Sequence, residues 1–214
     1  MTYRKIYIMK QFYEPNSLEL GIDEAGRGCL MGPVVVASVI LGDLEEPPPY
    51  KIRDSKKCSV KQRKILREYI EENAIAFNVQ FVQREVIDKV NILQATVLGM
   101  HRCIDKIIQT IKIDRLLIDG SYFPYYTFID GDNFEIIPHV CIPGGDNEYL
   151  NIAAASILAK EHHDEYIVQL CNENPILDNY DIRNNKGYGT KSHMAALKDF
   201  GPTEWHRKSF KPCS

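Results

Sequence analysis

Residues 18–41 read LELGIDEAGRGCLMGPVVVASVIL and contain two strand patterns on either side of a glycine-rich turn. Leu18, Leu20 and Ile22 alternate with polar or small residues, which is typical of a half-buried strand. Residues 34–41 are mostly β-branched and predict a central strand. Because the turn between these segments is rich in glycine, we expect the two strands to pair antiparallel.

Strand and helix patterns alternate along the rest of the chain. Extended patterns occupy residues 77–81, 115–118 and 134–142, and helical patterns follow Ser59 and Asn91 and cover about 149–171 and 192–200, with a loop at 184–189. This order predicts an α/β fold with a mixed β-sheet flanked by helices. We expect residues 1–175 to form this layered domain and residues 176–214 to form a small C-terminal helical and loop extension packed on it.

Composition excludes several classes of protein. The chain has 214 residues, of which 44% are hydrophobic and 26% charged, as in an ordinary globular domain rather than a disordered or fibrous one. The longest apolar run, residues 30–42, is shorter than the roughly 20 residues that span a bilayer, so we expect no membrane association. Six cysteines without a Cys-x-x-Cys pair argue against a zinc site and against a secreted disulfide framework. A cytoplasmic monomer is the default expectation.

Charge is distributed unevenly, although the formal net charge is only −3. Residues 53–67 carry a local charge of +6 and residues 183–211 carry +5, whereas residues 135–181 carry −8. Each segment alone is explained by a solvated surface. Together, two basic segments and one acidic segment suit a groove that follows phosphates beside an acidic, metal-binding cluster.

The glycine-rich turn does not match a nucleotide-binding loop. Arg27 and Gly28 stand where a P-loop has Lys and Ser or Thr, and the glycines are one residue out of register for a dinucleotide fingerprint. What remains is a pair of acids, Asp23 and Glu24, at the end of a strand. Adjacent strand residues point to opposite faces, so both acids serve one site only if the chain turns at residues 25–26 or if one of them contributes its carbonyl.

Two more acids occupy comparable places. Asp119 ends an apolar run and precedes a glycine, and Asp146 lies just before the alanine-rich helical pattern. A single aspartate at such a place is more often a turn former or a helix cap. Four acids without histidine, however, suit a hard divalent cation such as Mg²⁺. Two such ions about 4 Å apart promote in-line phosphoryl displacement.

Seven sequence blocks together resemble the type 2 ribonuclease H (ribonuclease HII) family over about residues 18–211. In order they are Asp23–Gly28, Asp54–Lys57, Ile118–Gly120, Gly145-Asp146, Ala153–Lys160, Gly187–Thr190, and Gly201-Pro202 with His206-Arg207 and Ser209-Phe210. The resemblance implies a ribonuclease H-like fold and cleavage of RNA in RNA–DNA hybrids with Mg²⁺ or Mn²⁺, two ions being expected with substrate. It also implies nicking at ribonucleotides embedded in duplex DNA, with 5′-phosphate and 3′-hydroxyl products.

The resemblance assigns roles to individual residues. It implies four catalytic and metal-binding acids: Asp23, Glu24, Asp119 and Asp146. It implies that Gly26, Arg27 and Gly28 form the loop that senses the ribonucleotide and that Tyr188 packs at the RNA–DNA junction. Ser55, Lys56 and Lys191 would contact phosphates. Missing Cβ atoms in the loop allow the backbone to approach the 2′-hydroxyl, the group that distinguishes RNA from DNA.

Five further positions are relevant to the expected site. The family usually has Lys at the position of Gly144 and often has Arg at the position of His163, so we expect these departures to affect substrate affinity and metal preference rather than the reaction. The pair His162-His163 is expected to serve the surface or the packing rather than a metal, because adjacent helical residues project about 100° apart. The role of His206-Arg207, structural or substrate-facing, is left open by the sequence.

Three alternatives remain at this point. The chain could be another member of the same broad fold group, such as a transposase or a proofreading exonuclease, although such exonucleases usually space their first acids as Asp-x-Glu. It could be a nucleic-acid-binding module with remnant acids, or a phosphate-cradling NTPase, which Arg27 and Gly28 disfavour. Metal-dependent cleavage of a duplex with one internal ribonucleotide separates these hypotheses.

Overall fold

The computed structural model describes residues 9–44, 47–131 and 133–214. The strands are β1 (Glu19–Ala25), β2 (Val34–Ile40), β3 (Ala76–Val82), β4 (Arg115–Asp119), β5 (Tyr126–Asp130), β6 (Asn133–Ile137) and β7 (His139–Ile142). The helices are α1 (Val60–Asn73), α2 (Arg84–Val90), α3 (Ile92–Ile107), α4 (Leu150–Glu173), α5 (Ile182–Asn185) and α6 (Lys191–Phe200). Short 3₁₀ turns cover Ser55–Lys57, Gly145–Asn147, Pro175–Tyr180 and Lys211–Cys213.

Five strands form one mixed sheet in the order β3-β2-β1-β4-β7. β1 pairs antiparallel with β2, with Asp23 opposite Ala37, and parallel with β4, with Ile22 opposite Ile118. The predicted hairpin and the predicted mixed sheet are therefore confirmed. Because β1 and β4 are parallel neighbours, their carboxyl ends, which carry Asp23 and Asp119, lie side by side at the same end of the sheet.

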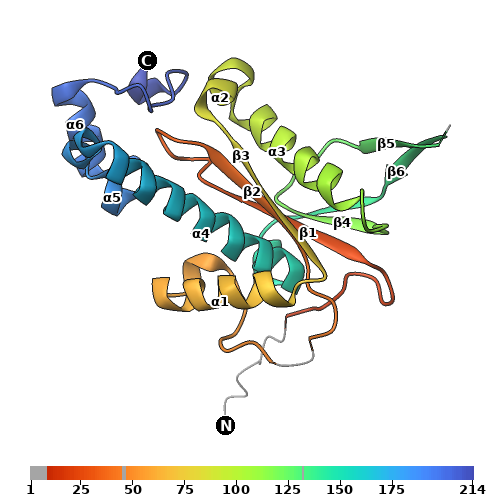
Figure 1. The fold of residues 1–214 in the computed structure, drawn as a ribbon. Helices are drawn as coiled ribbons and strands as arrows, with labels where there is room; N and C mark the ends of the chain where they lie inside the picture. Colours follow the sequence, from red (N-terminus) through yellow and green to blue (C-terminus); the bar gives the residue numbers. More distant parts are fainter. Residues whose placement is uncertain (1–8, 45–46, 132) are drawn as a thin grey trace, which may run out of the picture.

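Helices cover both faces of this sheet (Figure 1). On one face, α3 packs its Met100, Ile104 and Ile107 against the side chains of β1, β2 and β4. On the other face, the small residues of α4 pack against β2 together with α1. A Cβ at Gly21 would lie 2.3 Å from the Asn151 backbone, so the close approach of α4 to β1 requires glycine there.

The capping box predicted at the first helix is present. Ser59 accepts a hydrogen bond from the Gln62 amide, and the Gln62 side chain accepts one from the Ser59 amide. The pattern after Asn91 also forms a helix, with Asn91 as its N-cap residue. The short helix α2, directly before Asn91, was not predicted.

Three predicted segments need correction. The first strand is buried on both faces rather than half-buried, because it lies in the middle of the sheet between β2 and β4; even Glu19 is buried, where its carboxylate accepts hydrogen bonds from two backbone amides. Residues 134–142 are two strands in different sheets, since β6 pairs with β5 and β7 pairs with β4. The predicted loop at 184–189 begins inside the short helix α5.

The C-terminal residues pack on the far end of α4 (Figure 1). Apolar side chains of α4, the Pro175–Tyr180 turn and α6 share one buried cluster with Leu30 and Met31, which follow the glycine-rich turn. The division near residue 175 stays a prediction. In the part of the chain that the structure describes, no helix is long and apolar enough to cross a membrane.

Candidate active site

The first two acids lie at the carboxyl end of β1, and their side chains point to opposite faces of the sheet. Asp23 points toward α4, where it forms a hydrogen bond with Ser156. Glu24 points the other way and accepts a hydrogen bond from Arg27 at 2.9 Å. The backbone then turns at Gly26, whose φ of +84° lies in the left-handed region that favours glycine. The predicted turn is thus present, and both acids border the space beyond the strand end.

A cavity of about 450 Å³ occupies that space. Its lining gathers residues from β1, the turn that follows it, the 53–57 segment, β4, α4 and the 187–190 loop. They are Asp23, Glu24, Ala25, Gly26, Arg27, Gly28, Ser55, Lys56, Asp119, Ser156, Lys160 and Tyr188. Nine of the eleven predicted site residues are in this list. Asp146 and Lys191 do not line the cavity, and Lys191 is exposed at the start of α6.

Asp146 nevertheless belongs to the same acidic group. Asp119 accepts a hydrogen bond from the Gly145 amide at 2.8 Å, which joins the end of β4 to the turn that carries Asp146. The Asp146 side chain is buried and accepts a hydrogen bond from the Asn147 side chain. Asp54, which was not assigned a role from the sequence, lies close enough to Asp146 that its charge raises the pKa of Asp146. The acidic group therefore extends beyond the cavity to five carboxylates.

Burial and mutual repulsion raise the pKa values of the four predicted acids. Burial raises the pKa of Asp23 well above its usual range, with further contributions from the charges of Glu24 and Asp119. The pKa of Glu24 rises for the same first reason, although Arg27 opposes the shift. Burial raises the pKa of Asp119 too, against hydrogen bonds from two backbone amides. Burial and then Asp54 and Asp119 raise the pKa of Asp146 to about 6.

These residues fit a divalent cation that is completed by other ligands. One carboxylate oxygen of Glu24, Oε2, is buried and has no hydrogen-bond partner, and the group offers only oxygen donors. Within the described ranges, no three His, Cys, Asp or Glu side chains are gathered closely enough to hold a metal by themselves. Mg²⁺ is commonly bound by one or two carboxylates with waters and substrate phosphates, so the open arrangement is compatible with it.

The 53–57 segment is held in place beside the acids. Ser55 shares a hydrogen bond of 3.0 Å with Ser156, and the Lys56 charge lowers the pKa values of Glu24, Asp119 and Asp146. Behind the segment, Arg63 donates hydrogen bonds to the carbonyls of Ser55 and Cys58.

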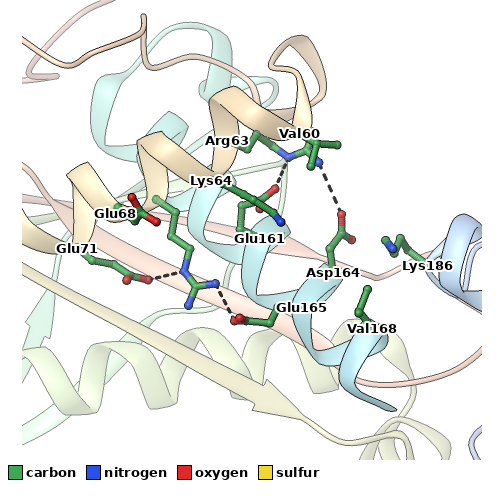
Figure 2. A pocket seen from close by; sticks show the side chains of 11 residues that line it. Val60, Arg63, Lys64, Glu68, Glu71, Glu161, Asp164, Glu165, Val168 and Lys186 are labelled. Carbon is green, nitrogen blue, oxygen red and sulfur yellow. Dashed lines mark hydrogen bonds and ion pairs between the residues drawn. The ribbon is translucent and has the colours of Figure 1, made fainter. Parts of the chain in front are cut away.

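A second cavity, of about 570 Å³, lies between α1 and α4 (Figure 2). Arg63 reaches across it to Glu161 at 2.5 Å and to Asp164 at 3.7 Å. A neighbouring arginine, Arg67, pairs with Glu71 and Glu165. The charged side chains that line this cavity are largely paired with one another. We therefore interpret their ion pairs as the contact that fixes α1 and the 53–57 segment on α4.

The glycine-rich turn packs against α4 through His163. A Cβ at Gly26 would lie 2.6 Å from the His163 ring, which is fully buried and is 3.6 Å from Cys29 Sγ. Neighbouring His162 bonds Glu71 at 2.8 Å, so the expectation that this pair serves packing and the surface is confirmed. The departure at position 163 therefore lies directly beneath the turn.

Tyr188 also lines the cavity. Lys160 Nζ lies 5.4 Å from its ring centroid, and burial raises the pKa of Tyr188. The contribution of Lys160 was not predicted, nor was that of Ser156, although both belong to the Ala153–Lys160 block. Burial settles the question left open for Arg207: it is 0% exposed, so it does not face the substrate.

A mixed sheet with two covering helical layers and acids at the ends of adjacent central strands is the architecture of ribonuclease H-like nucleases. The family model for ribonuclease HII matches residues 20–213 of the chain. A ribonuclease HII of Christiangramia forsetii is 43% identical over 208 residues, which are 95% of each protein. The ribonuclease HII in a complex with PCNA from Archaeoglobus fulgidus superposes with a TM-score of 0.67, at 25% identity, over 89% of this chain and 93% of that one. Bst-RNase HIII in complex with Mn²⁺ superposes at 0.61 and 19% identity, over 92% of this chain and 65% of that one.

The chain belongs to the ribonuclease HII family. It is an enzyme, a type 2 ribonuclease H, and members of this family are metal-dependent hydrolases that cleave the RNA strand of RNA–DNA hybrids. The resemblance recognised from seven sequence blocks is confirmed, as is the ribonuclease H-like fold.

Proposed function

We propose that this enzyme also nicks duplex DNA at single embedded ribonucleotides, leaving a 5′-phosphate and a 3′-hydroxyl. The observation that carries the proposal is that one cavity is lined both by Asp23, Glu24 and Asp119 and by the glycine-rich turn and Tyr188. Acids suited to hydrolysis thus line the same cavity as a turn whose two glycines lack side chains, which allows backbone groups to approach a 2′-hydroxyl.

In this proposal Asp23, Glu24, Asp119 and Asp146 hold two divalent cations, either Mg²⁺ or Mn²⁺. The bound ions would activate a water and stabilise the leaving oxygen. The raised pKa values of these acids support the assignment, because carboxylates that repel one another gain most from a bound cation.

The remaining residues would bind the duplex. Gly26, Arg27 and Gly28 would approach the ribose, and Tyr188 would pack against the nucleotide at the RNA–DNA junction. Ser55 and Lys56, and less directly Lys191, would contact phosphates. Arg27 is half exposed and is paired with Glu24, so its guanidinium can exchange that partner for a phosphate.

A metal-dependent cleavage assay tests the proposal with three duplexes of one sequence: an RNA–DNA hybrid, a DNA duplex with one ribonucleotide, and an all-DNA duplex. We expect cleavage of the first two, one nick in the second, and ends that a DNA ligase can reseal. Asp23→Asn should lower kcat at least about 100-fold and leave duplex affinity within a few fold. Failure to cut the duplex with one ribonucleotide would refute the proposal while leaving the hybrid activity intact.

A further inference from the structure

Arg207 is a fully buried cation far from the acidic group in sequence. It is the largest of the fully buried side chains, and burial lowers its pKa to about 10, so it stays charged at neutral pH. Within the described part of the chain, no carboxylate lies in ion-pair distance of it. A buried charge without a counter-ion needs other polar partners, and these partners indicate what the residue does.

All four hydrogen-bond partners are backbone carbonyls of the glycine-rich turn and its exit. Nε donates to Gly32 at 3.0 Å and Nη1 donates to Arg27 at 2.9 Å. Nη2 donates to both Gly26 and Pro33 at 2.8 Å. The planar, forked guanidinium suits this task, because its donors diverge in fixed directions toward several acceptors.

These bonds determine which way the peptide groups of the turn face. The C=O and N–H of a trans peptide point in opposite directions, and the described chain has no cis peptide. With the Gly26 and Arg27 carbonyls drawn toward Arg207, the N–H groups of Arg27 and Gly28 point away from it. Arg207 lies in the interior and the turn lines the cavity, so these two N–H groups face the cavity side.

The two N–H groups are available to a ligand. The neighbouring amides are used, since Cys29 N–H donates to Gly26 and Leu30 N–H donates to Gly187. Among the described residues, no backbone or side-chain acceptor takes the N–H of Arg27 or Gly28. Successive free N–H groups that face one way form a concave site for an oxygen acceptor.

We propose that Arg207 is a positioning residue that holds the N–H groups of Arg27 and Gly28 toward an oxygen of the bound ribonucleotide, either its 2′-hydroxyl or the adjacent phosphate. The proposal rests on the proposed function and adds to it a residue that positions the glycine-rich turn. Arg207 never touches the substrate, and it acts by fixing the backbone that does.

The test compares Arg207→Met and Arg207→Lys with Leu197→Ala. Leu197 is buried in the same C-terminal cluster and makes no side-chain hydrogen bond to the turn, so its variant controls for lost stability. For each protein, KM and kcat are measured on the duplex with one ribonucleotide, and Ki is measured for the all-DNA duplex as a competitor.

We expect Arg207→Met to raise KM at least about tenfold, Arg207→Lys to raise it less, and Leu197→Ala to leave KM and Ki within about twofold at a temperature where all are folded. A rise in KM with unchanged Ki would assign the N–H groups to the 2′-hydroxyl. An equal rise in both would assign them to the phosphate. Folded Arg207→Met with the KM and Ki of Leu197→Ala would overturn the proposal.

Two features keep the test decisive. If Arg207→Met does not fold, the test is made with Arg207→Lys alone. Lysine keeps the charge but cannot donate to four carbonyls that lie in different directions. If the wild type cuts no duplex with one ribonucleotide, the proposed function fails by itself. Hydrogen exchange of residues 26–28 then decides the role of Arg207: changed exchange in Arg207→Lys but not in Leu197→Ala supports it, and equal exchange in both refutes it.

Discussion

The carboxylate of Asp119 accepts a hydrogen bond from the backbone N–H of Gly145 at 2.8 Å. This bond holds the end of β4 against the turn that carries Asp146, in a place where a Cβ at Gly145 would lie 2.6 Å from the Ile152 side chain. Two acids that are distant in sequence are thereby kept close enough that the charge of Asp119 raises the pKa of Asp146. The fold holds like charges together before any cation is bound.

This arrangement predicts that the metal-free enzyme loses stability as pH rises. Folding raises the pKa values of these acids, so their contribution to stability is fully present below about pH 4, the ordinary range of the unfolded carboxyls, and is lost as pH rises through the folded values. For Asp146 the folded pKa is about 6. In EDTA, we expect the Tm of the wild type relative to Asp146→Asn to fall between pH 4.5 and 7.

The comparison with Asp146→Asn removes the contributions of the other titrating groups. At pH 7 in EDTA the variant should melt above the wild type, by about 2–4 °C for each 1 kcal/mol of repulsion removed. Adding Mg²⁺ or Mn²⁺ should reverse this order, because only the wild type keeps all four acids. A Tm difference that is independent of both pH and metal would contradict the assignment of Asp146 to the acidic group.

Gly26 and Gly28 should respond differently to alanine. Gly26 has a φ of +84° and its Cβ would lie 2.6 Å from His163, so Gly26→Ala should destabilise the fold by about 1–3 kcal/mol. At Gly28, the nearest atom to a new Cβ is in the Tyr188 ring at 4.0 Å, so Gly28→Ala should change stability by less than about 0.5 kcal/mol.

The activity of Gly28→Ala should fall although its stability does not. The Cβ of Gly28→Ala enters the cavity where the ribose would lie, so we expect kcat/KM on the duplex with one ribonucleotide to fall at least about tenfold in a fully folded protein. Thermal melts and cleavage rates measured on the same preparations provide the check. Wild-type cleavage by Gly28→Ala would show that the turn does not approach the ribose.

Two buried histidines support the loop that presents Tyr188. The Thr203 N–H donates to His206 Nδ1 at 2.9 Å, so His206 carries its proton on Nε2 and donates it to His193 Nε2, also at 2.9 Å. His193 Nδ1 then donates to the Tyr188 carbonyl at 3.0 Å. The relay needs both rings neutral, because a proton added to either would place two N–H groups against each other.

Acid should therefore weaken this part of the fold. Burial and the neighbouring His193 lower the pKa of His206 to about 4, so stability is lost as pH falls from the unfolded value near 6.5 toward 4. In His206→Gln, the decrease in Tm from pH 6.5 to 4.5 should be smaller than in the wild type, although the variant is less stable at pH 7. Parallel Tm profiles of the two proteins would exclude a role for protonation of this pair.

Local patterns were sufficient for most of the fold. The hairpin of β1 and β2, the capping box at Ser59 and the helix from Asn91 each depend on neighbouring residues, and each is confirmed. The split of residues 134–142 depends instead on which strand each half pairs with, which periodicity does not reveal. Helix α2 has seven residues and no side-chain cap, so it lacks the usual signals.

In the candidate site, too, the residues found from the sequence lie in short local motifs, and the residues that were missed depend on long-range contacts. The motif blocks indicated Asp23, Asp119 and the glycine-rich turn, because these residues occur in recognisable short stretches. The contributions of Asp54 and Arg207 depend on contacts with Asp146 and with the turn, across about 90 and 180 residues of chain. Such contacts are set by the packing of whole elements, and no short pattern in the sequence predicts them.

Position 144, where the family usually has lysine, offers a direct test of the electrostatics. Gly144 has a φ of +72°, and no atom lies within 4 Å of a Cβ placed there, so Gly144→Lys would fit at the cost of about 1 kcal/mol or more of backbone strain. Its ammonium would lie near Asp146, whose pKa is raised by neighbouring acids. We expect the variant to lower KM for the hybrid about 2- to 5-fold at low salt, as one added surface charge permits, and to lose this gain at high salt.

Gly131→Lys is the matched control, because Gly131 also has a positive φ, of +61°, and open space around its Cβ, but lies between β5 and β6 rather than beside the acids. The control should show a similar loss of Tm without the change in KM. Measurement of KM against salt concentration for both variants distinguishes a local effect near Asp146 from a general effect of added positive charge. Equal KM changes in the two variants would show that a charge at position 144 acts on substrate binding no differently from a charge elsewhere on the surface, and not through the acidic group.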